Sequence, residues 1–393
     1  MQRLIFLTTL FMLLSISLFE GLIIILTTYT FYSIARGRLK PYGRLFFPLL
    51  LYAIPTLLST VLYTPSHLGK GIERSLFLLV YPLGGKERLD YEFFKKFNLF
   101  FIMVGVLLIP AVIYKFLKTG EPAPLWGGWF EVGLLYSFFS LSALAMFLYT
   151  KMVHYLLLFL LFVGFVFFSM RRSAMLGLAI TLVFLLYLLR GFVSKKVLAF
   201  VLLSLTFTGS LTFGILVEKD PRFAIAWELI TGKRALDDQT LNTISSLRWE
   251  IFKKGLEVLQ KDIKEKNYLE LLIGHGINSG YYLEPKSPVG GTYESVFLLS
   301  ELIEKGVLGL AGILWLWLAY YSFFFRFKIR QREDLLLLPC LSFLSVLLIG
   351  SVFTFFWDAM LPWILLMFRV VEKHREGFKK ILLIKVYSAG VGD

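Results

Sequence analysis

The stretch Ser169-Met-Arg-Arg-Ser-Ala-Met-Leu-Gly-Leu178 places two adjacent arginines between two long apolar runs, Tyr155 to Phe168 and Ala174 to Leu189. Each run is close to the length of a helix that crosses a bilayer core of about 30 Å. The sequence therefore predicts two membrane helices that meet at Arg171 and Arg172. The arginines then lie at one membrane face, and which face it is decides whether they anchor the topology or take part in chemistry.

Apolar runs of this kind recur along the whole chain. Of its 393 residues, 57% are hydrophobic and 40 are Phe, with a mean hydropathy of +0.73, which is far too apolar for a soluble domain of this size. The alternating pattern of membrane β-barrels is absent, so we expect an all-α polytopic membrane protein. The runs predict twelve helices, over residues 4–18, 21–35, 44–63, 74–83, 97–117, 130–149, 152–168, 173–189, 197–217, 296–325, 335–356 and 359–371.

Two details of this count are open. The first two helices are separated only around Glu20-Gly21, and the first is interpreted as a retained helix, since no small-residue cleavage site follows it. The 74–83 run is too short to span a membrane alone, which leaves a re-entrant helix as the alternative. Trp126, Trp129, Trp357 and Trp363 lie near predicted helix ends and are interpreted as an aromatic belt at the membrane interface.

The basic residues predict the orientation, because Lys and Arg accumulate in short cytoplasmic loops. In the twelve-helix count all the basic connectors fall on one side: residues 36–44, 86–96, 151, 190–196, 326–332 and 373–380. Both termini are therefore expected in the cytoplasm. The net charge of +14 fits these cytoplasmic loops, and we expect no nucleic-acid partner.

One connector, residues 218–295, is much longer than the others and falls on the extracytoplasmic side. The predicted organisation is thus nine helices in 1–217, the large loop in 218–295, three helices in 296–371 and a basic tail in 372–393. Within the loop, residues 245–266 show the apolar spacing of an amphipathic helix, capped by Ser245 or Ser246. Gly and Pro in 274–291 favour an irregular segment.

The same count puts Arg171 and Arg172 on the extracytoplasmic side, where arginine is disfavoured. They share that side with Arg222 and Arg248 of the loop. In one interpretation the side chains simply reach lipid phosphates at the membrane boundary. In the other, their guanidinium groups form bidentate hydrogen bonds to a phosphate or diphosphate substrate.

Three segments of the second half extend this pattern: Ser246-Leu-Arg-Trp249, Leu271-Leu-Ile-Gly-His-Gly276, and the polar stretch from Thr292 into a helix containing Gly306-Val-Leu-Gly-Leu310. With the arginines at the start of a preceding helix, this order resembles the bacterial O-antigen ligase and polymerase family. The resemblance is sharpest over 245–312.

The resemblance implies a membrane glycosyltransferase of the GT-C type in the bacterial inner membrane. Such enzymes take a glycan from undecaprenyl diphosphate on the periplasmic face. Ligases pass it to the lipid A core, and polymerases pass it to another lipid-linked repeat unit. By this resemblance Arg172 and Arg248 match the family's essential arginines and hold the diphosphate, with Arg171 and Arg222 as further candidates. Transfer is expected to be inverting and independent of a metal or other cofactor.

The chain departs from the ligase pattern at the catalytic base. Ligases carry His-Asn eleven residues before the first glycine of the closing G-x-x-G, but counting back from Gly306 gives Ser295-Val296. Glu294 is one candidate general base, and the alternative is that Glu294 or Ser295 caps the helix that opens at Val296. His275 is the other candidate, or else an ordinary residue of a tight glycine turn.

The charged residues Glu301 and Glu304 lie on one face of the following helix. They are expected either to line an acceptor channel or to pack against neighbouring helices. Two functions of other classes also remain: a flippase or other transporter of lipid-linked oligosaccharides, and a non-catalytic assembly protein that binds the same lipid. The large exterior loop and the charges at one face favour the transferase over the transporter.

Overall fold

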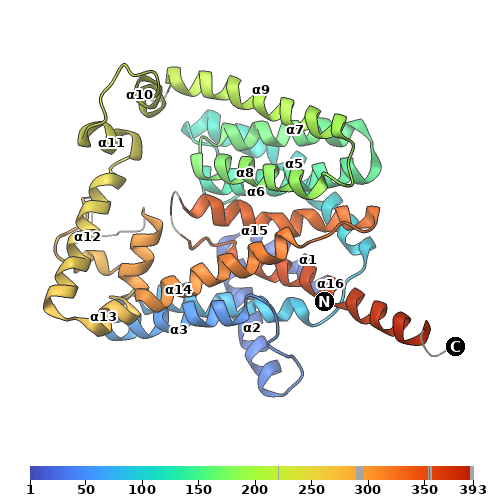
Figure 1. Cartoon of the computed structure of the whole chain (residues 1–393), viewed down its shortest axis with the longest axis horizontal. Coiled ribbons are helices and arrows are strands. Elements are labelled where there is room, and N and C mark those ends of the chain that lie inside the picture. Colours follow the sequence, from blue (N-terminus) through green and yellow to red (C-terminus); the bar gives the residue numbers. More distant parts are fainter. Residues whose placement is uncertain (220, 289–295, 353, 355, 390–393) are drawn as a thin grey trace.

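The computed structural model describes the chain except for residues 220, 289–295, 353, 355 and 390–393. The described residues fold almost entirely into helices, and none of them lies in a β-strand (Figure 1). The predicted all-α fold class is therefore confirmed.

Seven described helices are long and apolar enough to cross a membrane. They are α2 (Ile16–Ala35), α3 (Phe46–Tyr63), α5 (Tyr91–Thr119), α6 (Trp129–Thr150), α8 (Arg172–Leu189), α14 (Phe297–Phe325) and the segment Arg332–Ser351, which joins the 3-10 helix η4 (Arg332–Leu337) to α15 (Leu338–Ser351). Two shorter apolar helices are α1 (Gln2–Leu14) and α7 (Val153–Phe168). The protein is thus an all-α chain with several potential membrane spans, and the count of twelve stays a prediction.

The helices form two groups with α15 between them (Figure 1). One group contains α5 to α8 and α9 (Lys195–Lys219), and the other contains α1, α2, α3, α14 and α16 (Leu361–Ala389). Helix α15 packs against α6, α8 and α16. Its approach to α8 depends on Gly177, where an added Cβ would lie 2.3 Å from the carbonyl oxygen of Val346. Helix α8, which begins at Arg172, is therefore packed closely against the central helix α15.

Several predicted boundaries are wrong. The first two helices separate at Ser15, which is extended and precedes α2 as an N-cap residue, whereas Glu20 and Gly21 lie inside α2. Helix α16 does not end at 371 but continues into the segment predicted as a tail. Trp363 is only 1% exposed and packs among Phe97, Phe101 and Phe138, so it belongs to the core instead of an interfacial belt.

The 74–83 run forms the end of α4 (Leu68–Leu76) and most of the 3-10 helix η2 (Phe77–Gly85). Residues 77–84 are buried, and η2 packs against α16 and α2. The segment is therefore surrounded by protein, which is where non-helical backbone at membrane depth is tolerated.

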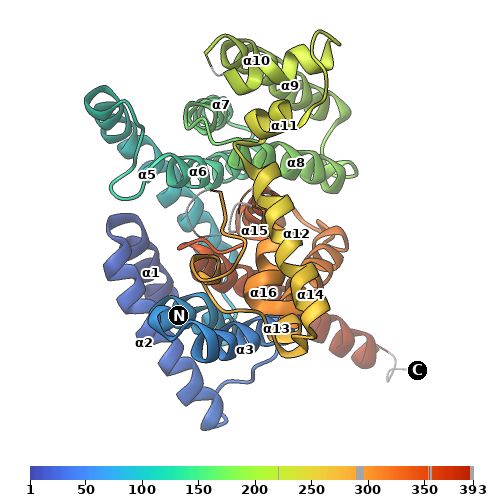
Figure 2. The same cartoon turned by 90° about the vertical axis from the view of Figure 1, so that its left-hand side faces the viewer.

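The described part of the long connector contains four α-helices that lie together at one end of the membrane helices (Figures 1 and 2). They are α10 (Pro221–Ile230), α11 (Asp238–Ser245), α12 (Arg248–Glu265) and α13 (Tyr268–Ile273). Helix α12 is the predicted amphipathic helix. Its buried residues Ile251 and Val258 pack on Leu299 and Ile303 of α14, and Gly255 allows the close approach. The loop is therefore anchored to a membrane helix through an apolar contact.

Candidate functional site

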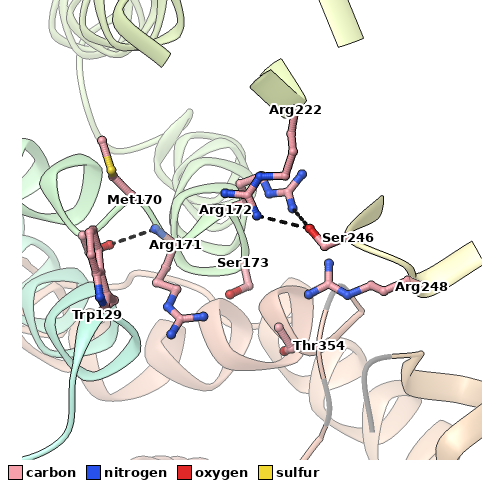
Figure 3. A pocket seen from close by; sticks show the side chains of 10 residues that line it. Trp129, Met170, Arg171, Arg172, Ser173, Arg222, Ser246, Arg248 and Thr354 are labelled. Atoms are coloured by element: carbon pink, nitrogen blue, oxygen red, sulfur yellow. Dashed lines mark hydrogen bonds between the residues drawn. The ribbon is translucent and has the colours of Figure 1, made fainter. Parts of the chain in front are cut away.

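Four arginines from three separate parts of the chain line one cavity of about 400 Å³. Arg171 and Arg172 lie at the start of α8, Arg222 in the first turn of α10, and Arg248 at the start of α12. Their guanidinium groups point toward a shared space (Figure 3). The other described lining residues are Trp129, Ser169, Met170, Ser173, Ser246 and Thr354. All four arginines that the sequence predicted for one site are thus brought together; we call this space the arginine cavity.

A tight turn between α7 and α8 aims the first two arginines. Met170 has a left-handed backbone with φ of 52°, and the extended Arg171 follows it. Ser169 Oγ accepts a hydrogen bond from the Arg171 backbone N–H at 3.3 Å. Since Arg172 is the first residue of α8, the helix also presents its N-terminal end, with its partial positive charge, to the cavity.

Ser246 links two of the arginines. Its Oγ accepts hydrogen bonds from Arg172 Nη2 at 3.3 Å and from Arg222 Nη1 at 3.2 Å (Figure 3). Arg172 Nη1 also donates to the Ile244 carbonyl oxygen at 3.0 Å. Ser246 and Leu247 are both left-handed, with φ of 57° and 66°, so the chain turns sharply between α11 and α12. This turn brings the serine to the arginines.

The fourth arginine is positioned by the start of α12. Ser245 Oγ accepts a hydrogen bond from the Trp249 backbone N–H at 3.1 Å, in the first turn of α12. The N-cap residue of α12 is Leu247, so the prediction that Ser245 or Ser246 caps this helix is wrong. The pKa of Arg248 is lowered, first because burial disfavours its charged form and then because Arg172, Arg222 and Arg171 are nearby like charges. Such a gathering of like charges is stabilised when an anion binds among them.

His275 does not lie with the arginines. Its Nε2 is 2.8 Å from Asp262 Oδ2, near the C-terminal end of α12. Arg248 starts the same helix, and fourteen residues at a rise of 1.5 Å separate the two ends by about 21 Å. The structure therefore places this candidate base far from the arginine cavity, in a hydrogen bond that joins the loop to α12.

The glycine motifs around His275 are explained by packing. The backbone of α14 kinks at Gly306, which has φ of 66°. The carbonyl oxygens of Ile303 and Glu304 accept hydrogen bonds there from the backbone N–H groups of His275 and Gly276, at 2.8 and 2.9 Å. A Cβ on Gly274 would lie 2.3 Å from Glu304 backbone atoms. The L-L-x-G-x-G and G-x-x-G segments thus fit against each other and fix the loop on the helix.

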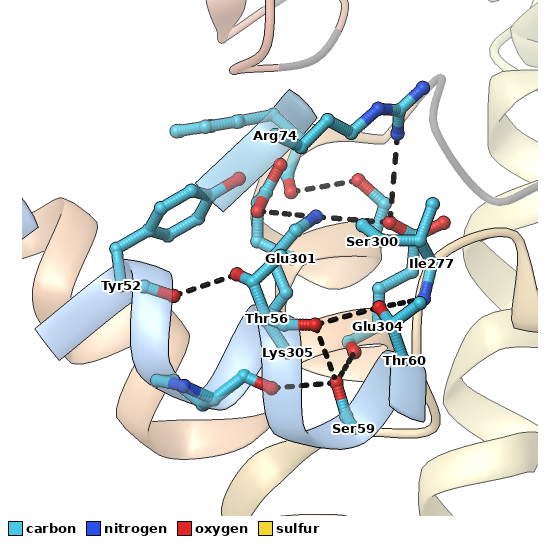
Figure 4. Close-up of polar contacts among 12 residues, drawn as sticks. Tyr52, Thr56, Ser59, Thr60, Arg74, Ile277, Ser300, Glu301, Glu304 and Lys305 are labelled. Atoms are coloured by element: carbon cyan, nitrogen blue, oxygen red, sulfur yellow. Dashed lines mark hydrogen bonds and ion pairs between the residues drawn. The ribbon is translucent and has the colours of Figure 1, made fainter. Parts of the chain in front are cut away.

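The carboxylates of Glu301 and Glu304 are buried in a charge network (Figure 4). Lys305 Nζ lies 2.8 Å from Glu301 Oε2 and 3.0 Å from Glu304 Oε2, and Arg74 Nη1 lies 3.9 Å from the latter oxygen. Glu304 Oε1 accepts a hydrogen bond from the Asn278 backbone N–H at 3.0 Å. Of the two expectations for this pair, these contacts favour packing over the lining of a channel.

Glu294 and Ser295, the other candidates for base or cap, lie outside the described residues. Helix α14 begins directly after Val296, as the sequence predicted. Among the residues that the structure describes, no group of three His, Cys, Asp or Glu side chains is arranged to hold a metal ion.

Sequence patterns alone did not identify Ser246, Thr354 or Trp129 as lining residues. A serine, a threonine and an interfacial tryptophan carry no signal until the fold brings them to the arginines. Lys305 was also not predicted, although its spacing of four residues from Glu301 is the usual signal for an ion pair on one helix face.

No protein-family model matches the sequence. The chain is 40% identical over 366 residues to an uncharacterized protein of Aquifex aeolicus (strain VF5), in an alignment that covers 91% of this chain and 93% of that protein. At this identity and coverage, the chain belongs to the same family as the Aquifex aeolicus protein.

Proposed function

We propose that the protein is a membrane glycosyltransferase of the O-antigen ligase type. It moves a glycan from undecaprenyl diphosphate to a lipid A-core acceptor on the periplasmic face of the bacterial inner membrane. The observation that carries this proposal is the convergence of Arg171, Arg172, Arg222 and Arg248 on one cavity at the end of membrane-crossing helices.

The cavity suits a lipid-linked diphosphate in charge and in size. Guanidinium groups form paired, charge-assisted hydrogen bonds to phosphate oxygens, and four of them match the several charges of a diphosphate. The volume of about 400 Å³ falls within the usual range of small-molecule sites, roughly 300–1,000 Å³. A lipid donor keeps its tail in the membrane, so its head must be recognised where the helices end.

The reaction follows from this position. An acceptor hydroxyl attacks the anomeric carbon of the glycan from the side opposite the diphosphate, and a new C–O bond forms. The bond from the anomeric carbon to the diphosphate oxygen breaks, and its electron pair stays on the diphosphate. The arginines stabilise the charge that develops on that leaving group. A general base takes the hydroxyl proton, and attack from the opposite side inverts the anomeric configuration.

Glu294 is our proposed base, since His275 is held by Asp262 about 21 Å along α12 from Arg248. Replacing Glu294 with Gln should abolish most turnover without weakening donor binding. His275→Ala should keep the turnover of the folded enzyme. If His275→Ala abolished turnover and Glu294→Gln kept it, His275 would be the base instead.

The decisive experiment supplies the purified protein in proteoliposomes with a lipid-linked glycan and, separately, with lipid A core or a second donor molecule. A ligase yields glycan on the lipid A core, whereas a polymerase lengthens the lipid-linked glycan. Movement of the donor between leaflets without transfer would overturn the proposal in favour of a transporter.

Substitutions in the arginine cavity test whether the transfer depends on this site. Arg172→Ala and Arg248→Ala should each lower turnover by about 100-fold or more. Removing one hydrogen-bond donor that stabilises the charge of a transition state has an effect of about this size in other enzymes. Lys261→Ala is the matched control, because Lys261 is exposed on the same helix as Arg248 and lies outside the cavity. Full activity in either arginine variant would contradict the proposal that the arginine cavity binds the lipid-linked diphosphate.

A further inference from the structure

A second group of basic side chains lines a cavity of about 330 Å³ far from the arginine cavity. Its lining consists of Arg44, Phe323, Arg326, Phe327, Lys328, Arg330 and Arg375. We call this space the basic cavity. It combines five cationic side chains with two aromatic rings.

The basic cavity lies at the opposite end of the membrane helices. The C-terminal end of α15 approaches the arginine cavity, since a Cβ on Gly350 would lie 3.0 Å from the Ser173 carbonyl oxygen. The segment with Arg330 leads into the other end of this helix, and the fourteen residues of α15 separate the two ends by about 21 Å. Helix α14, a potential membrane span, ends at Phe325 beside Arg326. The basic cavity is therefore at the depth where an apolar helix leaves the membrane.

The buried carboxylate of Asp334 holds the Arg375 side chain and the backbone of Arg330. Arg375 Nη2 lies 3.1 Å from Asp334 Oδ2, and its guanidinium group lies 4.1 Å from the centre of the Phe327 ring. Asp334 Oδ2 also accepts a hydrogen bond from the Arg330 backbone N–H at 2.8 Å. These contacts fix the loop after α14 and make the basic cavity a preformed feature.

Arg44 is held in a similar way on the other wall. Its guanidinium group lies 5.2 Å from the centre of the Phe323 ring, and its Nε lies 3.9 Å from Glu372 Oε1. The exposed side chains of Arg326, Lys328 and Arg330 form no ion pair among the residues that the structure describes. Five cations thus line the basic cavity, and only Arg375 and Arg44 of these five form an ion pair among the described residues, with Asp334 and Glu372.

We propose that the basic cavity binds the phosphate headgroup of an anionic glycerophospholipid. Phosphate oxygens meet the exposed cations, and the partly exposed Phe323 ring lies beside the start of the acyl chains. The end of α14 favours a lipid over a soluble phosphate compound, because a lipid presents its phosphate at this depth. Basic pockets between membrane helices bind anionic headgroups by the same chemistry.

The test counts lipids bound to the purified full chain by native mass spectrometry during titration with phosphatidylglycerol. The double variant Arg326→Gln/Arg330→Gln removes two exposed charges, and we expect its phosphatidylglycerol affinity to fall on the order of 30-fold. The matched control is Arg190→Gln/Lys195→Gln, which removes two exposed charges after α8 and outside the cavity. We expect this control to bind like the wild type.

Two further titrations identify the ligand. Phosphatidylcholine with the same acyl chains has no net negative charge and should not be retained. Glycerol phosphate and inorganic phosphate should displace phosphatidylglycerol only at much higher concentration. If both double variants lose the same phosphatidylglycerol affinity, the loss reflects general surface charge, and the proposal is overturned. Displacement by free glycerol phosphate at equal concentration would overturn the lipid assignment. Both variants alter exposed side chains, so unchanged thermal unfolding verifies their folding.

Discussion

Arg172 Nη2 donates a hydrogen bond across 3.3 Å to Ser246 Oγ, and this contact joins the start of α8 to the turn before α12. The two residues are 74 positions apart in the chain. Because Arg222 Nη1 donates to the same oxygen at 3.2 Å, one hydroxyl orients arginines from two helices. The geometry of the arginine cavity therefore depends on a side chain that carries no charge.

Ser246→Ala should weaken donor binding by about tenfold, or about 1.4 kcal/mol, because the serine only orients Arg172 and Arg222, whose guanidinium groups remain in the cavity. Kinetics with varied lipid-linked glycan should show a higher KM for the donor. Thr243→Ala is the control, because Thr243 lies in the same segment and its hydroxyl donates only to the Gln239 carbonyl oxygen among the described contacts. Unchanged donor affinity in Ser246→Ala would show that the serine does not position the arginines.

Gly306→Ala should destabilise the fold by several kcal/mol. Its φ of 66° disfavours any side chain, and a Cβ would lie 2.4–2.5 Å from the backbone of Leu272 and Gly274, which cannot move independently. The thermal midpoint in detergent should drop by at least several degrees. Gly164→Ala in α7 is the comparison, because a Cβ there meets nothing within 4 Å. If both variants have the same thermal midpoint, the packing of the 274–276 loop on α14 does not depend on the kink at Gly306.

Lys305→Met should be strongly destabilising, because it leaves Glu301 and Glu304 buried with less compensating charge. Breaking a buried ion pair on one side costs about 3–5 kcal/mol. Adding Glu301→Gln to this variant should restore part of the loss. Lys254→Met, which breaks an exposed pair with Glu257, should cost less than about 1 kcal/mol. A small effect of Lys305→Met on denaturation would mean that water reaches the network.

Much of this architecture follows from local sequence patterns. The apolar runs predict most of the helices because a helix at membrane depth needs continuous apolar length. The spacing of Ile251 and Val258 predicts α12, because one face of that helix packs on α14. The prediction that Arg171 and Arg172 share one side of the membrane with Arg222 and Arg248 comes from counting the predicted crossings between them; the cavity that joins them does not follow from that count.

Other features depend on contacts between distant residues, which no local pattern encodes. The positions of Gly274 and Gly306 make sense only when the two backbones meet. Ser246 is one of many serines until its oxygen reaches Arg172 and Arg222. The separation of His275 from the arginines depends on the direction in which α12 runs. Such features need the tertiary structure.

The last prediction concerns Asp358, a buried carboxylate in the connector between α15 and α16. Burial, followed by the charge of Glu131, raises the pKa of Asp358 from its ordinary value of 3.8 to about 7. The folded protein therefore binds a proton at this site that the unfolded chain has already lost between about pH 4 and 7. The stability that this proton contributes is fully present below pH 4 and is lost as pH rises through 7.

Asp358→Asn keeps an oxygen to accept the hydrogen bond from the Met360 backbone N–H, 2.8 Å from Oδ1 in the wild type, and removes the titration. The variant should therefore gain stability relative to the wild type as pH rises from 5 to 8. Thermal unfolding in detergent at pH 5, 6, 7 and 8 measures this difference. Glu121→Gln, on an exposed loop residue, should show no such trend. A constant difference between Asp358→Asn and wild type across this range would mean that Asp358 stays ionised in the folded protein, which requires solvent or a cation at its buried carboxylate.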